Sequence, residues 1–249
     1  MRFRALKFFP TKHEKLIVIA IVAFCGGTIV GLLPGMDGKT VMAAVGTLVT
    51  AFAGAFFAFR LNERREAVKS EQSELGAANR AIFSLIRAYN YIAGYHKQYL
   101  APFKGRPEAF IAIRPSIGNP NPDFKIDFDA ISFLIPQGKV EILGELSEFE
   151  EVFSSFVELV RTRNHVHANI VQPAMEAAGA VDGGDIYLNE IEKALGDRLA
   201  ATMRTLTEDL IETAEKGEKQ SEHLIESLSE IMRDLYPGRT VIAMEKSNK

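Results

Sequence analysis

Two apolar runs decide how this chain is built: LIVIAIVAFCGGTIVGLLPGM at residues 16–36 and TVMAAVGTLVTAFAGAFFAF at residues 40–59, separated only by DGK. Neither run contains a charged residue. A helix needs about 20 apolar residues to cross roughly 30 Å of hydrocarbon, because it rises ~1.5 Å per residue. The sequence therefore predicts an N-terminal transmembrane hairpin (16–59), with membrane helices at 16–36 and 40–59.

Positive charge flanks both outer ends of this hairpin, whereas the connecting loop carries only Asp37 and Lys39. The positive-inside rule then places both termini in the cytoplasm, as in a multi-pass protein of a bacterial inner membrane. A cleaved signal peptide is the alternative, but the second apolar run would remain as an anchor. Buried helices of a soluble protein are less consistent with two charge-free runs in series. The residues that set this topology are Arg2, Arg4, Lys7, Lys12, Lys15, Arg60, Arg64, Arg65 and Lys69.

Small residues recur every four positions in both apolar runs, and small side chains let membrane helices approach closely. The second run carries two such rows, so one row can hold the hairpin together while the other binds a second copy. We therefore expect the lipid bilayer as one partner, and a homo-oligomer or another protein as a further one. The residues predicted to pack the membrane helices are Ala23, Gly27, Gly31, Gly46, Thr50, Gly54 and Ala58.

The charge of the remaining chain argues against nucleic acid as a partner. Lys and Arg total 29 and Asp and Glu total 32, and residues 1–59 hold six of the former and two of the latter. Residues 60–249 thus carry a net charge of −7, and an acidic domain is repelled by phosphate backbones. The one cysteine, Cys25, lies in the first apolar run, so no intramolecular disulfide can form.

Residues 60–236 are predicted to form a cytoplasmic up-and-down bundle of long helices, between a basic cytoplasmic N-terminus (1–15) and a tail (237–249). The second membrane helix is expected to continue unbroken to about residue 100, since apolar residues resume at helical spacing from Leu75. Prolines then interrupt residues 101–136, which we expect to form an irregular strap across the bundle. Within this strap, residues 109–113 and 124–128 suit either two short extended segments or an irregular loop.

Two further helical regions follow the strap. One begins at about Gly138 or Ser147 and reaches His167 or beyond, and the other covers residues 185–235 with apolar residues spaced three and four apart. That spacing is typical of long antiparallel packing or a coiled coil. The apolar pattern lapses around Gly217, which predicts a break, a bend or a thin waist.

A polar cluster near the end of the helix before Pro173 is the only candidate for chemistry outside the membrane: Arg161, Arg163, Asn164, His165 and His167. Two histidines spaced by two point ~200° apart on a helix and cannot readily share a metal. We interpret the cluster as polar groups at a helix end, with Asn164 buried on the apolar stripe to fix the register. No metal site, cofactor or catalytic residue is predicted, because no metal, phosphate-binding or nucleophile motif occurs in the chain.

The sequence thus favours a non-enzymatic membrane protein whose cytoplasmic bundle serves as a protein-interaction, scaffold or sensing module. The alternative is an oligomeric effector that perturbs the bilayer, of the pore or depolarising type used in defence, gated by its cytoplasmic domain. An enzyme is the third class, and a pocket that joins residues 161–169 to several carboxylates would favour it.

Overall fold

The computed structural model describes residues 37–116, 124–179 and 188–244. The chain divides into two compact units, Met1–Gln72 and Ser73–Lys249. Every regular element among the described residues is helical, which confirms the predicted all-α class. The predicted membrane helix at residues 16–36 lies outside the described residues, so the hairpin itself stays a prediction.

The longest helix, α2, spans Gly38–Tyr95 and begins in the first unit and ends in the second. Together with the two short helical turns that follow it, this helix forms the run Gly38–Phe103, which is long and apolar enough to cross a membrane. No part of its most apolar window is buried inside the protein. The continuity of α2 confirms the predicted passage from the apolar run into the bundle without a break.

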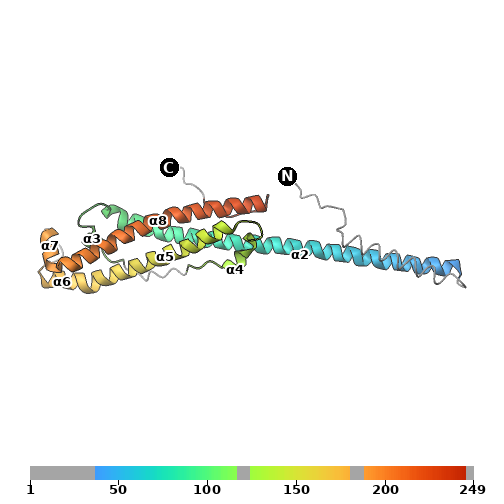
Figure 1. Ribbon diagram of the computed structural model, residues 1–249, viewed down its shortest axis with the longest axis horizontal. Helices are drawn as coiled ribbons and strands as arrows, with labels where there is room; N and C mark the ends of the chain where they lie inside the picture. The colour runs from blue at the N-terminus through green and yellow to red at the C-terminus, as the bar shows by residue number, and fades with distance from the viewer. Residues whose placement is uncertain (1–36, 117–123, 180–187, 245–249) are drawn as a thin grey trace. The chain divides into compact units, whose positions relative to one another are not determined.

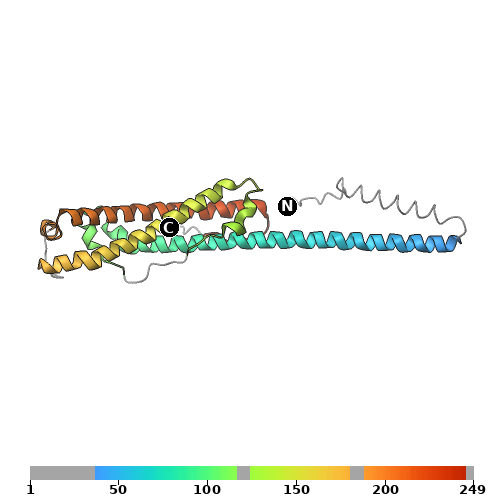
Figure 2. The ribbon, with the colours of Figure 1, turned by 60° about the horizontal axis from the view of Figure 1, so that its bottom comes forward.

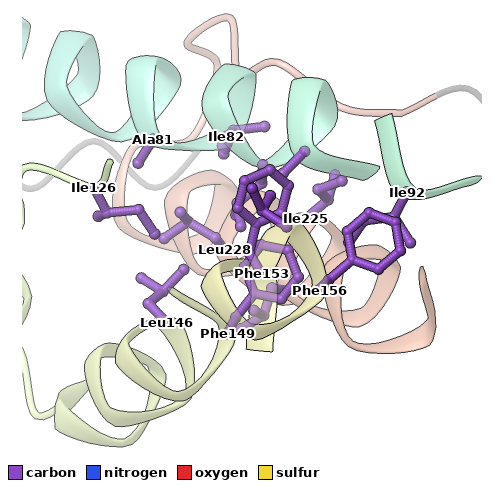
Figure 3. Packing of buried hydrophobic residues seen from close by; sticks show 14 of the residues in the cluster. Ala81, Ile82, Ile92, Ile126, Leu146, Phe149, Phe153, Phe156, Ile225 and Leu228 are labelled. Carbon is purple, nitrogen blue, oxygen red and sulfur yellow. The ribbon is translucent and has the colours of Figure 1, made fainter. Parts of the chain in front are cut away.

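The second unit is a bundle in which α2 from Ser73 onward lies beside α5 (Val140–Val166) and α8 (Asp197–Leu235) (Figures 1 and 2). Each helix buries one apolar stripe, and the three stripes meet in a common core. Aromatic side chains of α5 fill the centre of that core and face aliphatic side chains of the other two helices (Figure 3). The residues labelled there are Ala81, Ile82, Ile92, Ile126, Leu146, Phe149, Phe153, Phe156, Ile225 and Leu228.

Helix α8 runs antiparallel to α2. At one end of the bundle the Tyr236 hydroxyl donates to the Glu74 carboxylate, and further along α2 the side chain of Ile92 lies against Gly217. Residue numbers therefore rise along α2 as they fall along α8. In an up-and-down order of the three long helices the first and the third would run parallel, so this antiparallel pair departs from the predicted arrangement.

Helices α2 and α5 run parallel, so the predicted up-and-down order is wrong for this pair (Figure 1). The ring of Tyr91 lies 6.1 Å from that of Phe153, and the ring of Tyr95 lies 5.6 Å from that of Phe156. The reason is the long strap, which returns the chain along the bundle before α5 begins. Long crossover connections of this kind occur in other helical bundles.

Where the structure describes the strap, its helices are short: η2 (Ala101–Phe103), α3 (Ala109–Ala112), α4 (Phe128–Ile131) and η3 (Ser132–Leu134). The predicted extended segments are wrong, because residues 109–112 form a helical turn and no strand occurs among the described residues. Buried apolar side chains hold the strap on the bundle, notably Phe110, Ile113 and Ile126. The Ile126 N–H also donates to the Glu150 carboxylate of α5 over 2.9 Å.

A π-helical turn precedes a proline at two places in the bundle. The turn η1 (His96–Leu100) lies just before Pro102, and η4 (His167–Val171) lies just before Pro173 at the start of α6 (Gln172–Ala177). A proline ring clashes with the carbonyl four residues earlier in a regular α-helix. The wider turn accommodates this conflict without ending the helical path.

The predicted helix at 185–235 is divided at Gly196, which has φ +73° and separates α7 (Leu188–Leu195) from α8. Helix α8 itself is unbroken through Gly217, so the lapse in its apolar pattern is a thin waist. Ala214, Gly217 and Ser221 continue the buried stripe with small side chains. A Cβ atom at Gly217 would lie 2.9 Å from the Cδ1 atom of Ile92, so a larger residue there would require the Ile92 side chain to move.

Candidate functional site

The predicted membrane-packing residues that the structure describes all lie on α2, with their side chains or Cα atoms exposed. Gly46 and Gly54 have open space around them, and the Thr50 hydroxyl donates to the Gly46 carbonyl over 2.7 Å. This row therefore has no partner among the described residues. The opposing row Ala23, Gly27 and Gly31 lies outside the described residues.

Of the basic residues after the apolar run, Arg64, Arg65 and Lys69 are exposed on α2 and Arg60 is half-buried. Arg60 pairs with Glu63 over 3.1 Å and Lys69 pairs with Glu66 over 3.2 Å, each about one turn apart. Such surface pairs contribute little to stability. The other predicted topology residues, at positions 2 to 15, lie outside the described residues.

The polar cluster at 161–167 is where the structure departs most from the sequence-based interpretation. Arg163 is fully buried, His167 is nearly so, and Asn164 is only half-buried. Arg161 and His165 are exposed as expected. The buried stripe of α5 thus continues through Arg163 and His167 instead of Asn164, because the helix does not end at residue 167.

Arg163 donates three hydrogen bonds from within the core. Its Nε atom donates to the Thr207 hydroxyl of α8 over 3.0 Å. Its Nη2 atom donates to two strap carbonyls, that of Phe110 over 3.2 Å and that of Ile113 over 2.7 Å. One side chain therefore joins α5, α8 and the strap, and none of these three acceptors carries a formal charge.

Two neighbouring side chains of the same helix also hold the strap. His167 Nε2 donates to the Ile111 carbonyl over 3.1 Å, and Asn164 Nδ2 donates to the Ser116 hydroxyl over 2.9 Å. We name this set the clasp: Arg163 and Asn164 of α5 and His167 of η4, with their acceptors at Phe110, Ile111, Ile113 and Ser116 of the strap.

Burial determines the ionisation of the clasp. It lowers the pKa of Arg163 to about 10, which leaves the guanidinium charged at neutral pH. Burial also lowers the pKa of His167, and the charges of Arg163 and Arg114 lower it further against the opposing effect of the Ile111 carbonyl. His167 is therefore neutral near pH 7, with its proton on the Nε2 atom that donates to Ile111.

Several polar atoms in and beside the clasp are buried without a hydrogen-bond partner among the described residues: Tyr95 Oη, Arg163 Nη1, Asn164 Oδ1 and His167 Nδ1. The arrangement is suited to holding the strap in one position on the bundle. Sequence reasoning missed it because the acceptors are backbone atoms about 50 residues away.

A second polar contact joins α8 to the end of α2. His96 Nδ1 lies 2.9 Å from the Glu218 carboxylate, and the Glu215 carboxylate pairs with Lys104 of the strap. His96 is half-buried at this contact. In the described parts of the chain, no group of three or more His, Cys, Asp or Glu side chains is placed to hold a metal ion.

Comparisons of the chain with protein-family models, with curated proteins and with solved structures find no match. The functional argument therefore depends on the geometry of this chain alone.

The clasp predicts that stability depends on pH through His167. Because the pKa of His167 is lower in the folded state than the unfolded value of about 6.5, the unfolded state takes up the proton first as the pH falls. The free energy of unfolding should therefore decrease below about pH 6.5 and stop decreasing below the folded-state pKa. Urea unfolding between pH 7.5 and 5 measures this slope.

The variant His167→Gln keeps an amide donor but cannot titrate, so its slope should be smaller than that of the wild type. The matched control is His165→Gln, which removes an exposed histidine two residues away. Equal slopes for His167→Gln and His165→Gln would contradict the prediction.

Proposed function

We propose that this chain is a non-enzymatic membrane protein whose helical bundle binds a protein partner or organises an assembly in the cytoplasm. The observation that carries the proposal is α2, whose apolar part is exposed and continues directly into a packed bundle. Exposed apolar surface of this size is unfavourable in water and favourable in a bilayer. An anchored bundle without a recognisable reaction site is suited to binding and positioning other proteins.

The proposal includes a two-helix anchor in an inner membrane, with both termini in the cytoplasm. The charge flanking residues 16–59 supports this orientation. Cysteine labelling in intact cells tests it in a Cys25→Ser background. A cysteine at Lys39 should react with a membrane-impermeant maleimide, whereas one at Gln72 should react only after lysis. Labelling of both positions, or release of the protein from membranes by alkaline carbonate, would refute the anchor.

Crosslinking in membranes tests the binding function. We expect a specific partner or a self-associated species that persists when the membrane fraction is diluted before crosslinking. If neither a partner nor a self-associated species is recovered from cells that contain the protein in membranes, the binding function is wrong.

A membrane-perturbing effector is the second candidate, and the continuity of α2 favours it. A helix without a break between its apolar part and the bundle can couple a change in the bundle to the membrane. Expression with a membrane-potential dye tests this candidate. Depolarisation should be lost in Gly27→Leu and Gly54→Leu and retained in Ala53→Leu, which lies outside both small-residue rows. Unchanged potential in every induced state would exclude it.

A further inference from the structure

The exposed face of α2 within the bundle carries a row of residues spaced three and four apart: Arg80, Phe83, Arg87 and Asn90. Phe83 is 54 % exposed, although it is a large apolar side chain on a helix whose opposite face is buried. The face is hollowed on both sides of Ser84. The exposed ring of Phe83 lines one of these hollows, which together form a shallow groove along the helix.

Two adjoining cavities form this groove, which we name the α2 groove. The first has a volume of about 410 Å³ and is lined by Asn79, Arg80, Phe83, Ser84 and Ile242. The second has a volume of about 250 Å³, shares Ser84 with the first and has the apolar rings of Tyr91, Phe124 and Phe153 in its lining. Ile242 of the C-terminal segment and Phe124 of the strap thus lie at its two ends.

The C-terminal end of the groove is fixed by hydrogen bonds. The Ile242 N–H donates to Asn79 Oδ1 over 3.0 Å, and the Ser229 hydroxyl of α8 donates to the Ile242 carbonyl over 2.9 Å. Because these hydrogen bonds already order the wall of the groove, less conformational entropy is lost when a ligand binds.

The groove is basic in a domain that is otherwise acidic. Arg80 and Arg87 are exposed and form no ion pair with any described residue. The neighbours of the two arginines one helical turn away include Gly76, Phe83, Ser84 and Tyr91, and none of these carries a carboxylate. Seven residues of helix separate the two guanidinium groups by ~10 Å along the axis, with Phe83 between them.

From this geometry we infer that the α2 groove binds an acidic amphipathic helix of a partner protein, with an apolar side chain beside Phe83 and carboxylates on Arg80 and Arg87. Two carboxylates seven residues apart on the partner helix match the spacing of the arginines. Helix-in-groove recognition combines such apolar anchors with flanking charge. An anionic membrane surface fits less well, because the bundle has a net negative charge and the site is concave. The inference names the partner surface of the proposed binding function and therefore rests on it.

A defined probe tests the inference. It is a fluorescent, alanine-based helical peptide of about 18 residues with two glutamates seven residues apart on either side of a leucine. Its matched peptide carries lysines in place of both glutamates. Binding to the full chain in detergent micelles is measured by fluorescence anisotropy. The glutamate peptide should bind, and the lysine peptide should bind at least about tenfold more weakly.

The double variant Arg80→Glu/Arg87→Glu should raise the Kd of the glutamate peptide about tenfold or more, and Phe83→Ser should also raise it. The matched control Lys97→Glu/Arg198→Glu makes the same charge change at exposed positions elsewhere and should leave the Kd within about twofold. Since all these positions are exposed, thermal unfolding should be unchanged in every variant.

Three results would overturn the inference. The glutamate peptide does not bind, or the double variant and its control raise the Kd of this peptide equally. The third is that the double variant binds the peptide like the wild type and loses only its binding to vesicles of anionic lipid. If the double variant still captures the partner found by crosslinking, the groove is wrong and the proposed binding function stands. If no partner exists but the peptide binds, the groove is a binding site and the proposed function is wrong.

Discussion

Arg163→Met is expected to lower the free energy of unfolding by about 2–4 kcal/mol. Hydrogen bonds to a charged group contribute about 1.5–3 kcal/mol each, and Arg163 donates three of them to the strap and to α8. The cost of burying the guanidinium has the opposite sign, because methionine removes the charge. The lost hydrogen bonds outweigh this relief, since the carbonyls of Phe110 and Ile113 would remain buried or force the strap to detach.

The loss should be concentrated in the strap, which distinguishes the clasp from general destabilisation. Hydrogen exchange over residues 109–116 should accelerate in Arg163→Met more than exchange in the centre of α8. Arg163→Lys keeps the charge but cannot reach three acceptors in a fixed fork, so we expect little rescue. The control Arg161→Met alters an exposed arginine two residues away and should change stability by less than about 0.5 kcal/mol. Equal urea midpoints for the two methionine variants would contradict the role of the clasp.

Phe156→Ala is expected to have the largest effect, a loss of about 3–5 kcal/mol. Phe156 is fully buried between helices, and its ring meets those of Tyr91 and Tyr95 edge-on at centroid distances of 6.0 and 5.6 Å. Alanine would remove the transfer free energy of the ring and leave a cavity at the point where α5 contacts α2. Urea unfolding of the full chain in detergent measures the change.

The matched control for this variant is Phe83→Ala, which removes a phenylalanine that is more than half exposed. Its effect should remain within about 0.5 kcal/mol. Phe156→Leu should fall between the two, because leucine fills part of the cavity. A similar loss for Phe83→Ala and Phe156→Ala would mean that α5 does not pack on α2 as described.

The helical class and the long course of α2 follow from the sequence because apolar spacing reports directly which helix face is buried. The same spacing contains the signal for Arg163, since the stripe Phe149, Phe153, Phe156 and Val160 reaches residue 163 at the next step. A charged side chain at that position is normally assigned to the surface, because burying a charge is costly. The two strap carbonyls and the Thr207 hydroxyl accept hydrogen bonds from the buried guanidinium, and sequence patterns do not contain the positions of these acceptors.

The parallel order of α2 and α5 is a second feature that local patterns do not determine. It depends on the path of a strap in which prolines prevent long helices, and its contacts connect residues far apart in the chain. The thin waist of α8 at Gly217 is a third feature that local patterns do not determine. A glycine in a run of charged residues is equally compatible with a break, a bend or a thin waist, and the unbroken course of α8 with Gly217 against Ile92 shows the waist.

The order of the helices in the sequence determines when the core of the bundle can be completed during synthesis. Helix α2 leaves the ribosome first, yet Phe156 and the α8 residues that cover it are made some 60 to 140 residues later. At a synthesis rate of about 5–20 residues per second, the apolar stripe of α2 stays uncovered for roughly 10–30 s until the end of α8 has been made. During that time the uncovered stripe of a nascent chain can form non-native contacts with other chains. Attachment to a membrane surface, which separates the unfinished copies, would reduce such contacts.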